Sequence, residues 1–144
     1  LMRSAVSRPR GLRPGRLAHC EAGESMVEFA LVLPLLLIVL IGVVQFGLVH
    51  HAQNVANTAA QEGARVGAAE DGDPTLAVGR TLDVLRSGLG GVGDGFDVSA
   101  SESEEGVTVN ASGGYPLIIP WLGSQTVSIN AEAEMRKEGF RSGP

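Results

Sequence analysis

Apolar residues fill one continuous stretch near the start of the chain, from Phe29 to Val49. This stretch holds no Asp, Glu, Lys or Arg, and Gln45 is its only strongly polar residue. A helix rises 1.5 Å per residue, so about 20 residues cross the roughly 30 Å hydrocarbon core of a bilayer. A core helix of a soluble domain usually keeps a polar face, and this stretch has none. The pattern therefore predicts a transmembrane helix over residues 24–49.

The stretch "HHAQNVANTAAQEGARVGAA" is rich in helix-forming residues and predicts that the helix continues outside the membrane over residues 50–69. Small residues recur three or four positions apart in it and form a narrow helix-packing face, made of Ala52, Ala56, Ala59, Gly63 and Gly67. Such a face lets another helix or a sheet approach closely. We expect it to contact the protein's own C-terminal sheet, and a partner subunit is the alternative.

A second, shorter helix is predicted after the turn in "EDGDP". Asp73 is a favoured N-cap residue, and Pro74 suits the first helical position. Apolar residues then recur at the spacing of an amphipathic helix, at Val78, Leu82, Leu85 and Leu89. The glycines at its end stop the helix, and "GGVGDG" is expected to be a flexible joint.

Three later segments alternate apolar and polar residues with the period of a β-strand. They begin near Phe96, Val107 and Val127, and "SESEEG" predicts a hairpin between the first two, with its glycine at Gly106. A sheet of this size needs a cover on its apolar face, which the second helix can supply. The predicted fold class is α+β: a long N-terminal transmembrane helix, an amphipathic helix and a small three-stranded antiparallel sheet.

Charge sets the orientation that we expect for the membrane helix. Arginines precede it at positions 3, 8, 10, 13 and 16, with only Glu21 opposing them. An excess of Arg keeps that flank in the cytoplasm, so the C-terminal domain is expected to be extracytoplasmic. The net charge of −5 and the lack of clustered Lys and Arg after the helix argue against nucleic acid as a partner. The expected organisation is a basic cytoplasmic leader (1–23), the transmembrane helix (24–49), its continuation (50–69), a small extracytoplasmic α+β head (70–137) and a tail (138–144).

Two acidic residues, Glu24 and Glu28, stand at the start of the apolar stretch. A carboxylate near hydrocarbon is costly, although at the interface it can lie among lipid headgroups. The local order is more specific, because Gly23 is followed by "ESMV" and then by Glu28 and Phe29. This order resembles the pilin-type processing site of tight-adherence (Tad/Flp) pilus systems. Together with "VEFALVLPLLL", "QEGAR" and "VSINAEAEMR", the chain resembles the TadE-like pseudopilin family over roughly residues 23–137.

The resemblance implies a membrane-anchored minor pilin or pseudopilin that acts in pilus assembly, with no catalysis, cofactor or small-molecule substrate. It implies cleavage between Gly23 and Glu24 by a prepilin peptidase, where the bare backbone of glycine can enter the protease cleft closely. Glu28 would then be the fifth residue of the mature chain and would pair with the N-terminal amine of a neighbouring subunit. The implied partners are the membrane, other pilin or pseudopilin subunits and the peptidase.

The loop "YPLIIPWLG" between the second and third strands holds the only Trp and the only Tyr of the chain. One interpretation is a loop that folds over the core. The other is an exposed apolar patch at Tyr115, Ile118 and Trp121 that docks a partner subunit or contacts the outer membrane leaflet.

Two other functions stay open on the sequence alone: an unprocessed, signal-anchored extracytoplasmic binding or sensor module, and a secreted soluble domain. The apolar stretch is longer than the roughly 7–15 residues of a signal-peptide core, which disfavours the second.

No metal site is expected, because the adjacent His50 and His51 point apart on a helix. Cys20 is the only cysteine, so an intrachain disulfide is excluded.

Overall fold

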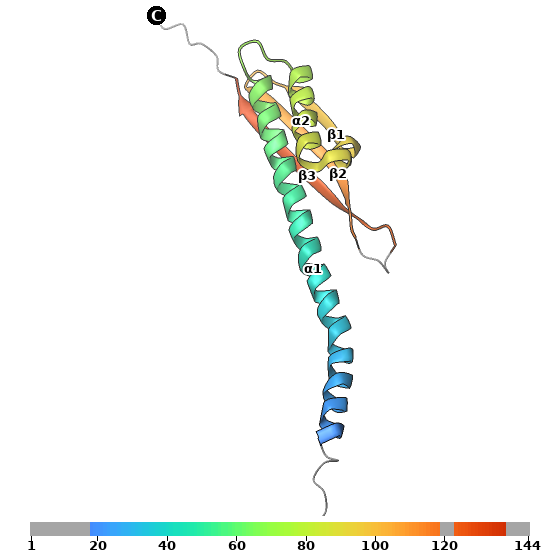
Figure 1. The fold of residues 1–144 in the computed structure, drawn as a ribbon. Helices are drawn as coiled ribbons and strands as arrows, with labels where there is room; N and C mark the ends of the chain where they lie inside the picture. The colour runs from blue at the N-terminus through green and yellow to red at the C-terminus, as the bar shows by residue number, and fades with distance from the viewer. Residues whose placement is uncertain (1–17, 119–122, 138–144) are drawn as a thin grey trace, which may run out of the picture. The chain divides into compact units, whose positions relative to one another are not determined.

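In the computed structural model, residues 18–118 and 123–137 are described. This part contains, in chain order, α1 (Ala18–Gly67), α2 (Pro74–Leu89), the 3-10 helix η1 (Gly90–Gly95), β1 (Asp97–Glu102), β2 (Gly106–Pro116) and β3 (Thr126–Arg136) (Figure 1). The chain divides into two compact units, residues 1–40 and residues 41–144, and α1 contributes to both. The predicted α+β fold with a long N-terminal helix, a second helix and a three-stranded antiparallel sheet is confirmed.

The first unit consists, in its described part, of the N-terminal half of α1. Residues 23–67 of this helix include a segment with a mean hydropathy of 2.9 that is long and apolar enough to cross a membrane, and none of that segment is buried within the chain. Pro34 lies inside the helix, which continues beyond it to Gly67. Membrane helices tolerate an internal proline, since local adjustments satisfy the carbonyl that loses its donor.

The second unit contains the sheet, in which the strands lie in the order β1-β2-β3 with antiparallel neighbours. Val98, Ala111 and Ala131 form one row across the three strands, because Ala111 pairs with both of the others. Side chains of this row point to the protected face, while their neighbours along each strand are exposed. The predicted hairpin is confirmed, since the backbone N–H of Ser103 donates to the carbonyl oxygen of Gly106 at 2.8 Å.

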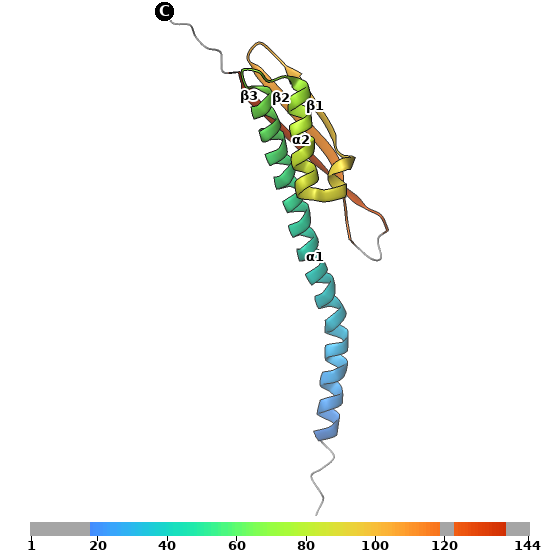
Figure 2. The same ribbon diagram turned by 45° about the horizontal axis from the view of Figure 1, so that its top comes forward.

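Two helices cover the protected face of the sheet: α2 and the part of α1 that belongs to the second unit (Figures 1 and 2). The core combines small residues on the helices with larger apolar residues on the strands and in α2. Its fully buried members include Ala52, Ala56, Ala59, Ala60, Ala64, Ala77, Leu85, Val107 and Val109. Alanine and glycine let the helix backbones lie close to each other and to the sheet. The core is therefore thin, and its packing depends on this short distance between the backbones.

The buried side of α2 differs from the predicted one. The apolar spacing predicted a face through Val78, Leu82, Leu85 and Leu89, and of these Leu85 alone is fully buried while the others are half-buried. The most buried line consists of Ala77, Thr81 and Leu85, because α2 contacts α1 as well as the sheet and the helix contact selects small residues. The hydroxyl of Thr81 donates to the carbonyl oxygen of Ala77 at 2.8 Å, which satisfies this buried polar group.

The start of α2 agrees with the prediction from the sequence, whereas the segment after α2 differs from its prediction. Asp73 caps the helix, because its Oδ1 accepts from the backbone N–H of Leu76 at 2.7 Å. The segment "GGVGDG" was expected to be a flexible joint, and it is the 3-10 helix η1. The close contact of Gly93 with α2 accounts for this regular structure. A Cβ at Gly93 would lie 2.6 Å from the carbonyl oxygen of Leu85, so η1 packs directly against the end of α2. An ion pair between Arg86 and Asp94, 2.7 Å apart, closes the same turn.

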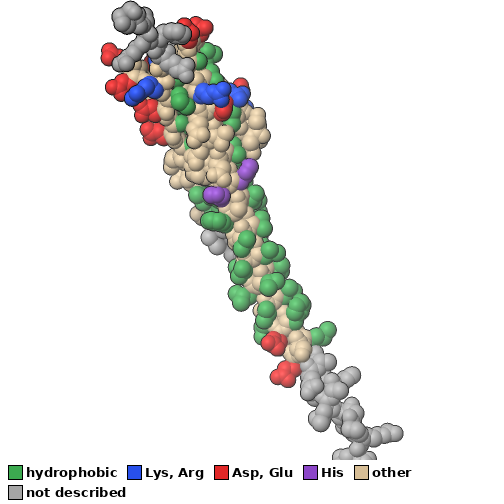
Figure 3. Space-filling view, turned by 90° about the vertical axis from the view of Figure 1, so that its left-hand side faces the viewer, with side chains coloured by type: hydrophobic (Ala, Val, Ile, Leu, Met, Phe, Trp, Pro, Cys, Tyr) green, Lys and Arg blue, Asp and Glu red, His purple; other side chains and the backbone are tan. Residues whose placement is uncertain are grey.

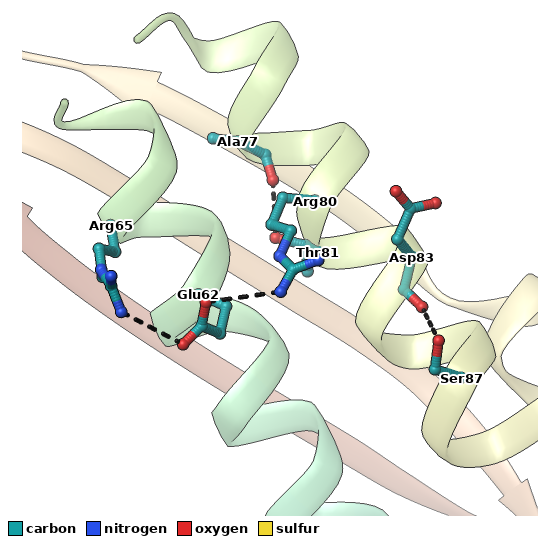
Figure 4. Close-up of polar contacts among 7 residues, drawn as sticks. All are labelled: Glu62, Arg65, Ala77, Arg80, Thr81, Asp83 and Ser87. Atoms are coloured by element: carbon teal, nitrogen blue, oxygen red, sulfur yellow. Dashed lines mark hydrogen bonds and ion pairs between the residues drawn. The ribbon is translucent and has the colours of Figure 1, made fainter. Parts of the chain in front are cut away.

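Glu62 of α1 links the two helices at the surface (Figure 4). Its Oε2 lies 3.7 Å from Nη2 of Arg80 in α2, and its Oε1 lies 3.8 Å from Nη1 of Arg65 in its own helix. All three side chains are at least one third exposed, so each pair contributes about 1 kcal/mol or less. The closeness of the two helices therefore depends mainly on the small residues beneath these charges.

We expect Gly63→Ala to lower the free energy of unfolding of the head by about 1–3 kcal/mol, the usual cost of overpacking. A Cβ at residue 63 would overlap Oγ1 of Thr81 and would lie 2.8 Å from the carbonyl oxygen of Ala77, which cannot rotate away. The measurement is urea unfolding of the full chain in detergent micelles, followed by circular dichroism.

Gly79→Ala is the matched control, because a Cβ at that position of α2 has no neighbour within 4 Å. Alanine is favoured over glycine inside a helix by roughly 0.5–1 kcal/mol, so this control should be neutral or stabilising. If the Gly63→Ala variant proved as stable as the Gly79→Ala variant, the close contact between α1 and α2 at Gly63 would be rejected.

Candidate functional site

Most of the exposed large apolar side chains in the described part of the chain lie on α1. Leu31 is 75% exposed, Phe29 64% and Phe46 75%. Between Met26 and Phe46, exposed apolar side chains follow one another around the helix, at Val27, Val32, Leu33, Leu35, Leu36, Leu37, Ile38, Val39, Leu40, Val43 and Val44. Consecutive helical residues point in different directions, so this set covers every face, and hydrophobic side chains line the helix in Figure 3. A helix that is apolar all round requires lipid or other apolar helices on all sides.

The predicted processing residues lie together near the N-terminal end of this surface. Gly23, Glu24, Glu28 and Phe29 are all exposed positions of α1. Glu24 and Glu28 are four residues apart and therefore share one side of the helix. Within the described part of the chain, neither carboxylate takes part in an ion pair. Packing among the described residues does not require a glycine at position 23, because a Cβ there would have no neighbour within 4 Å among them.

The small-residue face of α1 is used inside the chain. Ala52, Ala56 and Ala59 have no exposed surface. Gly63 and Gly67 lie against α2, and a Cβ on Gly67 would be 2.8 Å from that of Ala77 and 3.0 Å from Cγ1 of Val107 in β2. The contact with α2 was not expected from the sequence, because the amphipathic pattern of α2 gave no sign that a second helix lies beside it.

The loop after β2 contacts α1 through Gln45, the one strongly polar residue of the apolar stretch. Oε1 of Gln45 accepts from the backbone N–H of Ile118 at 2.9 Å, and the Gln45 side chain is buried although the apolar residues on either side of it are exposed. Tyr115 is half-buried against the core, whereas Ile118 is 66% exposed. Trp121, the third residue of the predicted patch, lies outside the described residues. The loop thus covers the core at Tyr115 and exposes an apolar side chain at Ile118.

The described part of the chain contains no group of three or more His, Cys, Asp and Glu side chains that could hold a metal ion. The ring of His50 stacks on that of Phe46, with centroids 6.2 Å apart. A shallow hollow in the second unit is lined by Arg65, Ala68, Ala69, Met135 and Arg136, and combines no nucleophile with a general base.

Comparison with known proteins agrees with this reading of α1. Residues 23–65 match the family described as TadE-like protein, a family of structural proteins associated with Tad pilus systems. The match begins at Gly23, covers the apolar stretch and most of the small-residue face, and ends at Arg65. No curated protein and no solved structure matches the chain. The resemblance to the TadE-like family is thus confirmed over residues 23–65, which form the long helix and contain none of the sheet.

Proposed function

We propose that this chain is a minor pilin or pseudopilin, anchored in the membrane by α1, that takes part in assembly of a tight-adherence pilus and has no catalytic activity. The observation that carries the proposal is the exposed apolar surface of α1, which ends at Glu24 and Glu28 beside Gly23. A helix of this kind is stable in lipid before assembly and in a bundle of like helices after it. The folded head supplies the contacts outside the membrane.

Processing by a prepilin peptidase between Gly23 and Glu24 is part of the proposal, and the structure offers a physical reason for the glycine. Gly23 lies inside α1, and a peptide bond must leave the helical conformation to enter a protease cleft. Glycine weakens a helix by roughly 1 kcal/mol relative to alanine, so local unwinding costs least at this position. Among the described residues, none lies within 4 Å of a Cβ built at this position.

Cleavage also changes the surroundings of Glu28. The shortened helix would begin at Glu24, so Glu28 would stand near its first turn, where the helix dipole favours a carboxylate by roughly 0.3–1 kcal/mol. The new amine on Glu24 of a neighbouring subunit can then pair with Glu28. Pairing matters in lipid, because an unpaired charge there is costly.

We expect Glu28→Gln to leave membrane insertion and protein level unchanged, since an uncharged residue is accepted more readily by the bilayer. Subunit–subunit crosslinking in the membrane should fall roughly tenfold or more, because removing one partner of a desolvated ion pair leaves the other without compensation. Glu104→Gln is the control, because that exposed carboxylate lies in the hairpin between β1 and β2 and is not part of the apolar stretch of α1. Normal crosslinking and pilus yield in the Glu28→Gln strain would contradict the pairing.

Orientation gives a second prediction. A cysteine placed at Glu104 in a Cys20→Ser background should react with a membrane-impermeant maleimide in intact spheroplasts, because the head is expected outside the cytoplasm. In a Gly23→Val chain, which should keep its leader, the native Cys20 should react only after the membrane has been opened. The reverse labelling would overturn the proposed orientation, whatever the state of processing.

A further inference from the structure

The hydrogen bond between Gln45 and Ile118 joins the head to the membrane helix at a defined depth. Gln45 stands four residues before Val49, the last residue of the uncharged stretch, which corresponds to about 6 Å along the helix. Side chains on a helix tilt toward its N-terminus, so the Gln45 amide lies no nearer the end of the stretch than its own backbone. The backbone of Ile118 is 2.9 Å from that amide. If α1 spans a membrane, this part of the head therefore lies below the end of the span.

Residues 116–118, next to Gln45, leave no backbone N–H without a partner. Leu117 donates its N–H to the carbonyl oxygen of Gln125 at 2.8 Å, Ile118 donates to Gln45, and Pro116 has no N–H to satisfy. Irregular backbone at membrane depth is tolerated only where such donors have partners, because each unsatisfied group costs several kcal/mol in hydrocarbon. The described backbone next to Gln45 therefore meets this condition at Leu117 and Ile118.

The distribution of charge along β2 also favours lipid contact at its C-terminal end. Residues 106–131 hold no Asp, Glu, Lys or Arg, and this range includes all of β2 and the loop that follows it. The hairpin at the other end of β2 carries Glu102, Glu104 and Glu105. The two ends of β2 are about 34 Å apart at 3.4 Å per residue, so acidic side chains gather at one end of this strand and the other end carries none.

We propose that the β2–β3 end of the head is a second membrane-contacting element, in which Gln45 holds the Tyr115–Ile118 backbone against the span and Ile118 enters the lipid leaflet on the head side. The side chain of Ile118 is exposed, and so are those of Val44 and Phe46, the residues on either side of Gln45. Contact with lipid covers these side chains at once. The inference rests on α1 being a membrane span, which the proposed function also requires.

A nitroxide spin label at position 118 tests the inference directly. The chain would carry Cys20→Ser and Ile118→Cys and would be reconstituted in vesicles of phosphatidylethanolamine and phosphatidylglycerol. Collision rates with molecular oxygen, which concentrates in lipid, and with a water-soluble nickel chelate would then be compared. Labels at Val39→Cys in the span and at Glu104→Cys in the hairpin are the references. The ratio of oxygen to nickel collisions at 118 should exceed that at 104 by roughly tenfold and approach that at 39.

Each other outcome overturns the inference in a distinguishable way. A nickel-accessible label at 118 with a lipid-exposed label at 39 would leave the anchor standing and reject the loop contact. Nickel access at both positions would reject the membrane span and the inference together. A label at 118 that is shielded from both reagents would mean that a protein neighbour covers this end of the head instead of lipid.

The Gln45→Leu variant separates the effect of the hydrogen bond to Ile118 from the effect of an apolar side chain at position 118. The substitution keeps the helix apolar and removes the acceptor for the Ile118 N–H, so the label at 118 should shift toward the nickel reagent by several-fold. Phe46→Leu is the matched control on the adjacent exposed position and should leave the ratio unchanged. An unchanged ratio in Gln45→Leu would reject Gln45 as the residue that holds the loop at this depth.

Discussion

The apolar surface of α1 between Met26 and Phe46 must be kept from water, and most features of the chain follow from that need. Transfer of one Leu side chain out of water is worth roughly 1.5–3 kcal/mol, and the helix exposes many such side chains on all its faces. No single protein surface can cover a helix all round. A bilayer can, and so can a ring of similar helices.

The helix changes its packing partner along its length. Through the apolar stretch its side chains are large and exposed, and from Ala52 onward one side of it carries alanine and glycine and is buried against α2 and the sheet. Small residues permit the close approach that gives the head a core despite its few large apolar side chains. Gln45 marks the change, because its Oε1 accepts a hydrogen bond from Ile118 while its neighbours Val44 and Phe46 remain exposed.

Much of this could be predicted from the sequence, because the signals are local and periodic. The long apolar run, the Asp73 cap and the period-2 strands each follow from residues close together in the chain. The buried side of α2 was predicted incompletely, since Ala77 and Thr81 are buried only because α1 lies beside them. The regular structure of η1 depends on the close contact of Gly93 with Leu85. The hydrogen bond between Gln45 and Ile118 joins positions far apart in the chain. Hydrophobic periodicity carries no information about such contacts.

Processing at Gly23 is the step on which the proposed pilin function depends most, and the intact mass of the wild-type chain tests it most directly. The chain would be extracted from the membranes of cells that contain a prepilin peptidase. The predicted mass is that of a chain beginning at Glu24, and because Cys20 leaves with the leader, the same chain should not react with a thiol reagent under denaturing conditions. A chain that retains the residues before Glu24 and one reactive thiol would contradict the assignment as a processed pilin subunit.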